Sequence, residues 1–289
     1  MSDLKAGFVG LGAMGWPMAG HLKQRGLLVA VANRSADKAT AFAAEHGVVA
    51  PASIAELAPR CNLIVLCVSA DADVLGVVRE IAAAAKPDTI VIDHSTVSPE
   101  TAKEAHAMMR KAGGDFIDAP VSGGVEGAKN GKLSIMAGGD AATLERARPV
   151  LEAYGAKIGH MGVVGAGQST KAVNQVLVAG IAQGVCEGLA LGEALGLDPA
   201  VLLPTLASGA AGCWFLDKRG ATMLANDFRG GFKAALLHKD LKIVREMAER
   251  AGTDHSIVDH AIGDLAELMR EGRGDEEHSA VIRRKRRSR

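Results

Sequence analysis

Two polar residues stand out because they interrupt an otherwise apolar helical pattern at 168–195. Lys171 and Asn174 are three residues apart, so a helix places both side chains on one face. A lysine in apolar surroundings loses hydration, which lowers its pKa. A carbonyl that receives a hydride needs such a donor, because negative charge grows on its oxygen. The alternative is an ordinary lysine that faces solvent from the first turn of the helix.

A second polar motif, Ser122-Gly123-Gly124, follows a predicted strand at 116–119. It therefore lies at the carboxyl edge of a sheet, where alternating strand–helix folds bind ligands. Consecutive backbone N–H groups in a glycine turn can form a concave anion site, and the Ser122 hydroxyl adds another donor. A small carboxylate fits these donors. A glycine-rich turn without a ligand is the alternative.

The spacing GxGxxG lies between a predicted strand at 7–9 and a predicted helix at 14–25. In that context the motif is typical of a loop that binds the pyrophosphate of a dinucleotide. The first glycine permits a tight turn, the second lets the backbone approach the phosphates, and the third allows helix and strand to pack closely. The helix N-terminus adds unpaired N–H groups, whereas a structural glycine turn is the alternative. The predicted loop comprises Gly10, Leu11, Gly12, Ala13, Met14 and Gly15.

The residues after the second predicted strand, at 28–32, indicate which dinucleotide binds. An NAD site usually has an acidic residue here for the ribose 2′-hydroxyl, but this chain has Asn33-Arg34-Ser35 and no carboxylate before Asp37. Arg34 offers a planar cationic fork that matches a 2′-phosphate, and Ser35 and Lys38 can add contacts. The sequence therefore favours NADP(H). In the alternative, Arg34 stacks on the adenine and NAD(H) binds as well.

The elements that position these motifs alternate in the first half of the chain. Further strands are predicted at 63–68, 89–92 and 134–137, and helices at 36–45, 72–85, 100–112 and 141–153. This rhythm predicts an α/β fold with a Rossmann-type doubly wound sheet. After residue 165 we expect helices only, at 168–195, 234–251 and 255–271, with Asp198-Pro199 starting another. We therefore expect a cofactor domain at 1–164 and an all-helical substrate and dimerisation domain at 165–289.

The composition argues against several other classes of protein. The 289 residues carry 33 basic and 33 acidic side chains, so the net charge does not indicate a nucleic-acid partner. The four cysteines lack the spacing of a zinc site, and no metal is expected. The sequence contains no uncharged run of about 18 apolar residues, so we expect no membrane span. We also see no leader pattern at its start. We expect a cytoplasmic protein whose basic end, 283–289, is solvated and frayed.

Four segments in this order resemble the β-hydroxyacid dehydrogenase family. The family includes 3-hydroxyisobutyrate dehydrogenases, tartronate semialdehyde reductases and glyoxylate/succinic semialdehyde reductases. The matching segments are GFVGLGAMGWPMAGHL (7–22), DAPVSGGVEGAKNGKLSIMAGG (118–139), GQSTKAVNQ (167–175) and FKAALLHKDL (232–241). The resemblance covers about residues 6–280 and implies a homodimer or homotetramer.

The resemblance also implies roles for particular residues. Lys171 would be the catalytic general acid/base, and Asp240 would support the helix arrangement, although spacing alone favours a surface position for Lys239-Asp240. Substrate would be bound by Ser122, Gly123, Gly124, Asn174 and Trp214. Beyond the glycine loop and Asn33, Arg34 and Ser35, the cofactor would contact Val68, Ser69, Thr96, Phe232 and Lys239.

Small departures from the family pattern leave the expected chemistry intact. Lys132 replaces a frequent threonine, and Gln175 replaces a frequent asparagine. Trp214 narrows the pocket, which favours a short hydroxy acid or semialdehyde carrying a carboxylate. The alternatives are a non-catalytic NADP-binding interaction module, an imine or other carbonyl reductase, and a 6-phosphogluconate dehydrogenase relative. The sequence does not identify the physiological substrate.

Overall fold

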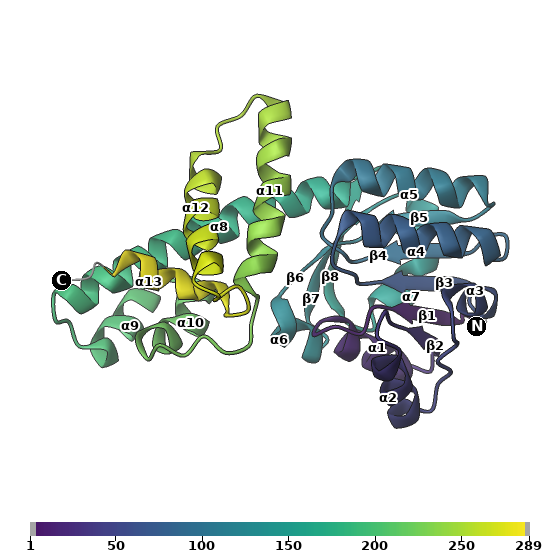
Figure 1. Ribbon diagram of the computed structural model, residues 1–289, viewed down its shortest axis with the longest axis horizontal. Coiled ribbons are helices and arrows are strands. Elements are labelled where there is room, and N and C mark those ends of the chain that lie inside the picture. The colour runs from purple at the N-terminus through teal and green to yellow at the C-terminus, as the bar shows by residue number, and fades with distance from the viewer. Residues whose placement is uncertain (1–3, 287–289) are drawn as a thin grey trace. The chain divides into compact units, whose positions relative to one another are not determined.

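The computed structural model describes residues 4–286, which form two compact units (Figure 1). The first unit ends at Lys171 and the second begins at Ala172. One helix, α8 (Ala166–Ala194), starts in the first unit and continues into the second. The first unit has an apolar core on each face of its sheet, and the second unit has a core of its own.

The first unit is built on one eight-stranded sheet within the described part of the chain. Five strands run parallel in the order β2-β1-β3-β4-β5, and β7 is antiparallel to β5. Both β6 and β8 pair with β7. The strands are β1 (Ala6–Val9), β2 (Leu28–Ala32), β3 (Leu63–Leu66), β4 (Ile90–Asp93), β5 (Asp115–Asp118), β6 (Val121–Ser122), β7 (Leu133–Gly138) and β8 (Gly155–Gly162).

Helices cover both faces of this sheet because its parallel strands are apolar on both sides. Val65 of β3 packs in the core that includes Met18 and Phe42, whereas Ile64 and Leu66 pack in the core that includes Val78. Figure 1 shows α4 and α5 on one side of the sheet, and α1 and α2 on the other. The helices are α1 (Gly15–Gln24), α2 (Ala36–His46), α3 (Ile54–Leu57), η1 (Ala58–Arg60), α4 (Asp71–Ala84), α5 (Pro99–Lys111), α6 (Gly124–Lys129) and α7 (Ala141–Leu151).

The second unit is helical throughout its described residues. Its core joins one face of α8 to the apolar sides of the helices that follow, and α11 and α12 lie side by side in Figure 1. Asp198 caps α9 by accepting a hydrogen bond from the Ala200 N–H at 2.9 Å, and Pro199 takes the first helical position. The elements are α9 (Pro199–Ala207), α10 (Trp214–Leu224), α11 (Ala234–Ala251), α12 (Ser256–Arg270), η2 (His278–Val281) and α13 (Ile282–Lys285).

The predicted fold class is confirmed, a Rossmann-type sheet followed by a helical part. The predicted strand at 28–32 and helix at 234–251 have the observed bounds. Sequence reasoning missed α10 and the strands β6 and β8. The edge strand β8 contains three glycines and no fully buried residue, so it lacks the apolar run that marks the other strands.

The expectation of a frayed basic end is wrong for the residues that the structure describes. Arg286 contacts both carboxylate oxygens of Glu193 at 2.7 and 2.8 Å, and Lys285 contacts Asp264 at 2.7 Å. Arg283 and Arg284 also pair with acidic residues of the helical unit. The run of basic residues does not reveal these partners, and that of Arg286 lies 93 residues away in the sequence. Residues 287–289 of the predicted tail lie outside the described residues.

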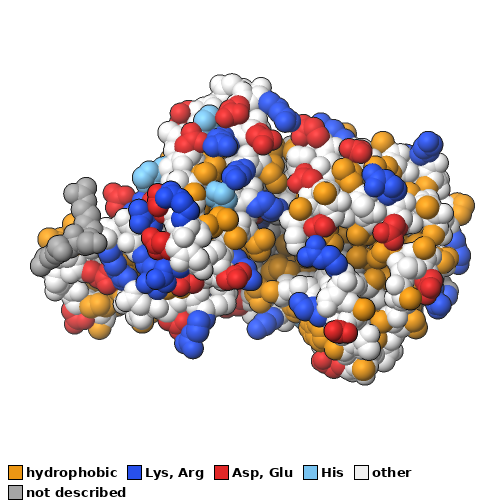
Figure 2. Space-filling model, in the orientation of Figure 1, with side chains coloured by type: hydrophobic (Ala, Val, Ile, Leu, Met, Phe, Trp, Pro, Cys, Tyr) orange, Lys and Arg blue, Asp and Glu red, His pale blue; other side chains and the backbone are white. Residues whose placement is uncertain are grey.

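The surface and the long helix add two observations on charge and hydropathy. Basic and acidic side chains are interspersed over the face drawn in Figure 2. Helix α8 is long and apolar enough to span a membrane by length and composition only, and one of its faces is buried in the core of the second unit. Among residues 4–286, no group of three or more His, Cys, Asp or Glu side chains is arranged to hold a metal ion.

Candidate active site

The glycine loop after β1 has the geometry of a ligand-binding turn. Gly10 has a φ of +100°, and a Cβ there would lie 2.2 Å from the Cys67 carbonyl oxygen. A Cβ on Gly15 would lie within 3.0 Å of Gly10 and Phe8, so this glycine lets α1 pack against β1. At Gly12 a Cβ would meet no atom within 4 Å. The space beside Gly12 is therefore open at the point where the motif brings backbone and phosphate together.

Asn33 connects the end of β2 to this glycine loop. Its Oδ1 accepts a hydrogen bond from the Leu11 N–H at 2.9 Å, and its Nδ2 donates to the Ser35 carbonyl at 3.1 Å. The side chain of Arg34 is 90% exposed, and its Nη1 lies 3.8 Å from Asp73 Oδ1. Asn33 thus shapes the loop, while Arg34 is accessible to a ligand.

The substrate loop predicted at 122–124 is a short strand followed by a left-handed turn. Ser122 pairs with Ser134 in β7, and both glycines have positive φ, +125° at Gly123 and +62° at Gly124. A Cβ on Gly124 would meet no atom within 4 Å. The turn therefore exposes its backbone at the edge of the sheet, as an anion site requires.

Lys171 is buried against this loop, with 8% of its surface exposed. Its Nζ donates a hydrogen bond to the Val121 carbonyl oxygen at 2.9 Å. The interpretation of Lys171 as a solvent-facing lysine of the first helical turn is therefore wrong. Loop and lysine lie together although they are 50 residues apart in the sequence.

Asp118 is the residue that sequence reasoning missed. It ends β5, and its carboxylate accepts hydrogen bonds from the N–H groups of Gly165 and Gln168, each at 2.8 Å. These groups lie at the start of α8, where backbone donors lack partners within the helix. A Cβ on Gly167 would lie 2.8 Å from Asp118 Oδ2, so only glycine allows this approach. The anchor thereby sets the position of Lys171, one turn further along.

Burial governs the ionisation of this anchor. Desolvation raises the pKa of Asp118 to about 6, against the opposing effect of the backbone N–H groups that bind its carboxylate. The only sequence signal was its place at the end of a strand, and that position did not reveal its partners 47 and 50 residues away.

Gln168 connects α8 to a second loop, at 93–97, that contains Thr96. Its Nε2 donates to the Ser95 carbonyl at 2.8 Å, and its Oε1 accepts from the Val97 N–H at 3.2 Å. The Ser95 hydroxyl in turn accepts from the Val68 N–H at 2.9 Å. One buried glutamine therefore links the predicted cofactor residues Val68 and Thr96 to the helix that carries Lys171.

His94 connects this same loop to the segment that leads into Ser122. Its Nδ1 lies 2.5 Å from the Ala119 carbonyl oxygen and its Nε2 lies 2.7 Å from the Tyr154 hydroxyl. Burial lowers the pKa of His94 to about 4, so the ring is neutral at pH 7. Since a carbonyl oxygen only accepts, Nδ1 carries the proton and Nε2 accepts from the tyrosine.

Polar side chains in the second unit form a chain that ends at Asn174. Asn174 Nδ2 donates to Gln175 Oε1, Gln175 Nε2 donates to Asp240 Oδ2, and each distance is 2.8 Å. Lys239 lies 3.0 Å from Asp240 Oδ1. The surface interpretation of the Lys239-Asp240 pair is wrong for Asp240, which is buried and fixes both amides.

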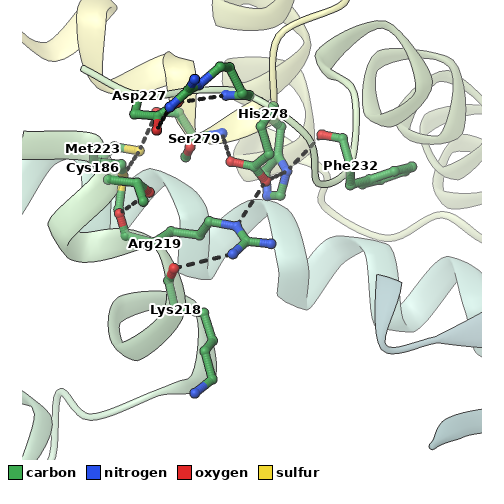
Figure 3. Close-up of polar contacts among 11 residues, drawn as sticks. Cys186, Lys218, Arg219, Met223, Asp227, Phe232, His278 and Ser279 are labelled. Carbon is green, nitrogen blue, oxygen red and sulfur yellow. Dashed lines mark hydrogen bonds and ion pairs between the residues drawn. The ribbon is translucent and has the colours of Figure 1, made fainter. Parts of the chain in front are cut away.

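Phe232 lies in the loop between α10 and α11, and the first residue of η2 holds this loop by hydrogen bonds (Figure 3). Its carbonyl oxygen accepts from the His278 N–H at 2.9 Å and lies 3.2 Å from His278 Nδ1. Glu277 lies between His278 Nδ1, at 2.8 Å, and Arg219 Nε, at 3.7 Å. Trp214, at the start of α10, is largely exposed and has the Arg219 guanidinium over its ring.

The elevated pKa of Asp118 predicts how stability depends on pH. The carboxyl is protonated near pH 6 in the folded protein but near pH 4 in the unfolded chain, so its contribution to stability rises as pH falls through this window. Relative to Asp118→Asn, the wild-type protein should gain free energy of unfolding between pH 7 and pH 4.5, on the order of 2 kcal/mol. Urea unfolding at both pH values measures the difference.

Asp37→Asn is the control for this comparison, because it removes an exposed carboxylate and shows how the free energy of unfolding responds to pH when a surface acid is lost. A loss of wild-type stability relative to Asp118→Asn toward pH 4.5 would show that the pKa of Asp118 is lowered by folding rather than raised.

Family models match both halves of the chain. Residues 5–165 match the family model of the NAD binding domain of 6-phosphogluconate dehydrogenase. Residues 165–284 match the family model described as NAD-binding of NADP-dependent 3-hydroxyisobutyrate dehydrogenase. Together the two models span nearly the whole chain.

Individual relatives and structures agree in length as well as in fold. The chain is 34% identical to an NAD-dependent L-serine dehydrogenase of Pseudomonas aeruginosa over 284 residues, 95% of each protein. A structure of Mycobacterium tuberculosis 3-hydroxyisobutyrate dehydrogenase with L-serine superposes with a TM-score of 0.89 at 34% identity, covering 98% of this chain and 99% of that one. A structure of Psf3 with NADP⁺ and 2-OPP has a TM-score of 0.88 at 26% identity, covering 96% and 99%. The chain belongs to the β-hydroxyacid dehydrogenase family and is an NAD(P)-dependent oxidoreductase acting on a CH–OH group.

Proposed function

We propose that this enzyme interconverts a small β-hydroxy acid and its semialdehyde or keto acid, with NADP(H) as the preferred cofactor and Lys171 as general acid/base. The observation that carries the proposal is the buried Lys171, whose Nζ is hydrogen-bonded to the Val121 carbonyl next to the exposed Ser122-Gly123-Gly124 turn. An ammonium group and an anion-binding turn are thereby adjacent. A hydroxy acid has a partner for each group. Its hydroxyl oxygen exchanges a proton with the ammonium group, and its carboxylate binds to the turn.

The residues of the first unit fit a nicotinamide dinucleotide. The open space at Gly12 admits a pyrophosphate beside the N-terminus of α1, and exposed Arg34 is accessible to a 2′-phosphate. When bound, the cofactor supplies or accepts the hydride. Val68, Ser69 and Thr96 are the proposed contacts toward the nicotinamide end, and Phe232 and Lys239 are those from the second unit.

The chain's own groups would handle the carboxylate and the proton. The Ser122 hydroxyl and the backbone N–H groups of Gly123 and Gly124 hold the substrate carboxylate. Lys171 Nζ donates a proton to the carbonyl oxygen in reduction and removes it from the hydroxyl in oxidation. Asn174, fixed through Gln175, orients the substrate hydroxyl. Trp214 limits the length of the acyl chain.

The matched relatives support a small substrate but differ in cofactor. One is named an NAD-dependent L-serine dehydrogenase, and one solved structure contains L-serine, itself a β-hydroxy acid. The model that matches the second half is described as NADP-dependent, and another matched structure contains NADP⁺. The Asn33-Arg34-Ser35 segment, which lacks a carboxylate, supports NADP(H) for this chain.

We also propose that residues 165–289 mediate self-association of a cytoplasmic enzyme, as a dimer or tetramer, while residues 1–164 bind the cofactor. One stripe along α8 is exposed in the single chain and consists of apolar residues and glycines, so a second copy of the chain can cover it. A Cβ on Gly184 or Gly188 would meet no atom within 4 Å, so a second helix can approach closely there. The stripe comprises Val173, Leu177, Ile181, Gly184, Gly188 and Leu191, and exposed Leu195 follows directly after the helix.

Initial rates test the reaction. Turnover is expected with at least one of glyoxylate, succinic semialdehyde, methylmalonate semialdehyde or tartronate semialdehyde with NADPH, or with L-serine and NADP⁺. Lys171→Ala should lower kcat on the order of 10²- to 10⁴-fold and leave cofactor affinity unchanged, because only proton transfer is lost. Lys157→Ala, on the exposed edge strand, is the matched control. Full activity of Lys171→Ala would remove this residue from its role.

The proposed cofactor preference depends on Arg34. Arg34→Ala should weaken binding of NADPH at least tenfold more than binding of NADH, because only NADPH carries the 2′-phosphate that the guanidinium pairs with. Fluorescence titration of the reduced cofactors measures both dissociation constants. Equal weakening of the two would indicate stacking on the adenine instead of phosphate recognition.

The apolar stripe predicts the effect of a charge at its centre. Leu177, with 61% of its surface exposed, would lie within the proposed helix–helix contact. Leu177→Glu should therefore shift the protein toward smaller species, because association would bury a carboxylate without a partner. Sedimentation velocity measures the shift. Val163→Glu, also an exposed apolar position but outside the stripe, should leave the oligomer intact. An unchanged oligomer in Leu177→Glu places the interface elsewhere.

A further inference from the structure

A carboxylate from a different part of the sheet faces the exposed arginine of the proposed 2′-phosphate site. Asp73 Oδ1 lies 3.8 Å from Arg34 Nη1, and the Asp73 side chain is 35% exposed. Arg34 follows β2, and Asp73 is in the first turn of α4, which follows β3. Because β1 lies between β2 and β3, the pair spans the edge of the sheet at which β1 runs into the glycine loop.

Asp71, the other acidic residue in the first turn of α4, has a structural role. Asp71 Oδ1 accepts hydrogen bonds from the Ser98 N–H at 2.9 Å and from the Thr101 hydroxyl at 2.7 Å. These bonds lower the pKa of Asp71 against the raising effect of its burial, and they connect α4 to the start of α5. Asp71 is thus committed to the fold, whereas Asp73 is directed toward Arg34.

The ion pair is loose, and both groups are accessible to solvent. At 3.8 Å the two atoms are beyond ordinary hydrogen-bond distance, and the Arg34 side chain is 90% exposed. The guanidinium has five N–H donors in one plane, so one side of it can face Asp73 while another receives a ligand. A ligand that approaches Arg34 therefore experiences the charge of Asp73 as well.

We propose that Asp73 is a specificity-determining residue that reduces the preference of the site for NADP(H) over NAD(H). This inference rests on the proposed function. A 2′-phosphate carries close to two negative charges, so a carboxylate beside Arg34 repels it and competes for the guanidinium. A ribose 2′-hydroxyl is neutral and can donate a hydrogen bond to a carboxylate. Asp73 thereby supplies from α4 the acidic group that NAD sites usually have after β2 and that Asn33-Arg34-Ser35 lacks.

The test is a set of dissociation constants for NADPH and NADH, measured by fluorescence titration without substrate. Asp73→Asn keeps the shape of the side chain and removes its charge. It should strengthen NADPH binding, weaken NADH binding, and raise the ratio in favour of NADPH about two- to fivefold, the range of an exposed charge pair. Raising the salt concentration should shrink the gain for NADPH, because exposed charges are screened. Glu80→Gln, an exposed position on the same helix, is the matched control for net charge.

The double variant Arg34→Ala/Asp73→Asn and its two single variants distinguish the role of Asp73 from the existence of the 2′-phosphate site. If Asp73 acts through Arg34 and the 2′-phosphate, its removal gives a smaller gain in NADPH affinity once Arg34 is absent. An unchanged or lower ratio in Asp73→Asn, together with a selective loss of NADPH in Arg34→Ala, overturns the role of Asp73 and leaves the proposed 2′-phosphate site intact. Equal weakening of both cofactors by Arg34→Ala overturns the 2′-phosphate site itself.

Discussion

The geometry of the first unit depends on one buried carboxylate at the junction of a strand and a helix. Asp118 ends β5 and binds the free backbone N–H groups at the start of α8. Burying a charge is costly, and here the partial positive charge of a helix N-terminus offsets part of that cost, so the pKa of Asp118 is still raised. The same contact that satisfies the helix end also holds the first turn of α8 at the end of β5. The distance between Lys171 and the substrate loop is set by this arrangement, because both follow from the end of β5.

Neutral hydrogen bonds also connect the loops around the candidate site. Gln168 ties α8 to the Thr96 loop, and His94 ties that loop to Ala119, just before the substrate turn. Each of these side chains is buried and uses its donors and acceptors on backbone groups or on Tyr154. Such contacts are directional, so they fix relative positions more sharply than apolar packing does. Lys171 and Arg34 are the charged groups proposed to bind ligands, whereas the hydrogen bonds of Gln168 and His94 that connect the loops involve neutral groups.

Local signals in the sequence predicted the parts of the protein that depend on local physics. The glycine loop, the start of α9 at Asp198 and the apolar parallel strands each follow from neighbouring residues. Contacts over long sequence distances could not be predicted. The sequence around Asp118 does not indicate its partners at 165–168, and the sequence around Asp240 does not indicate Gln175. Lys171 was singled out by its apolar surroundings, but its partner Val121 was not. The edge strand β8 was missed because exposed strands lack a buried apolar run.

The anchoring of the chain's last described residues has a consequence for biosynthesis. Val281 and Ile282 are part of the core of the second unit, and Arg286 binds Glu193 of α8. During synthesis these contacts can form only after residues 281–286 have left the ribosome, which is later than the residues of the first unit. The first unit, whose contacts are complete by Lys171, can fold while the remainder is still being made. The helical unit exposes part of its core until residues 281–286 have emerged from the ribosome.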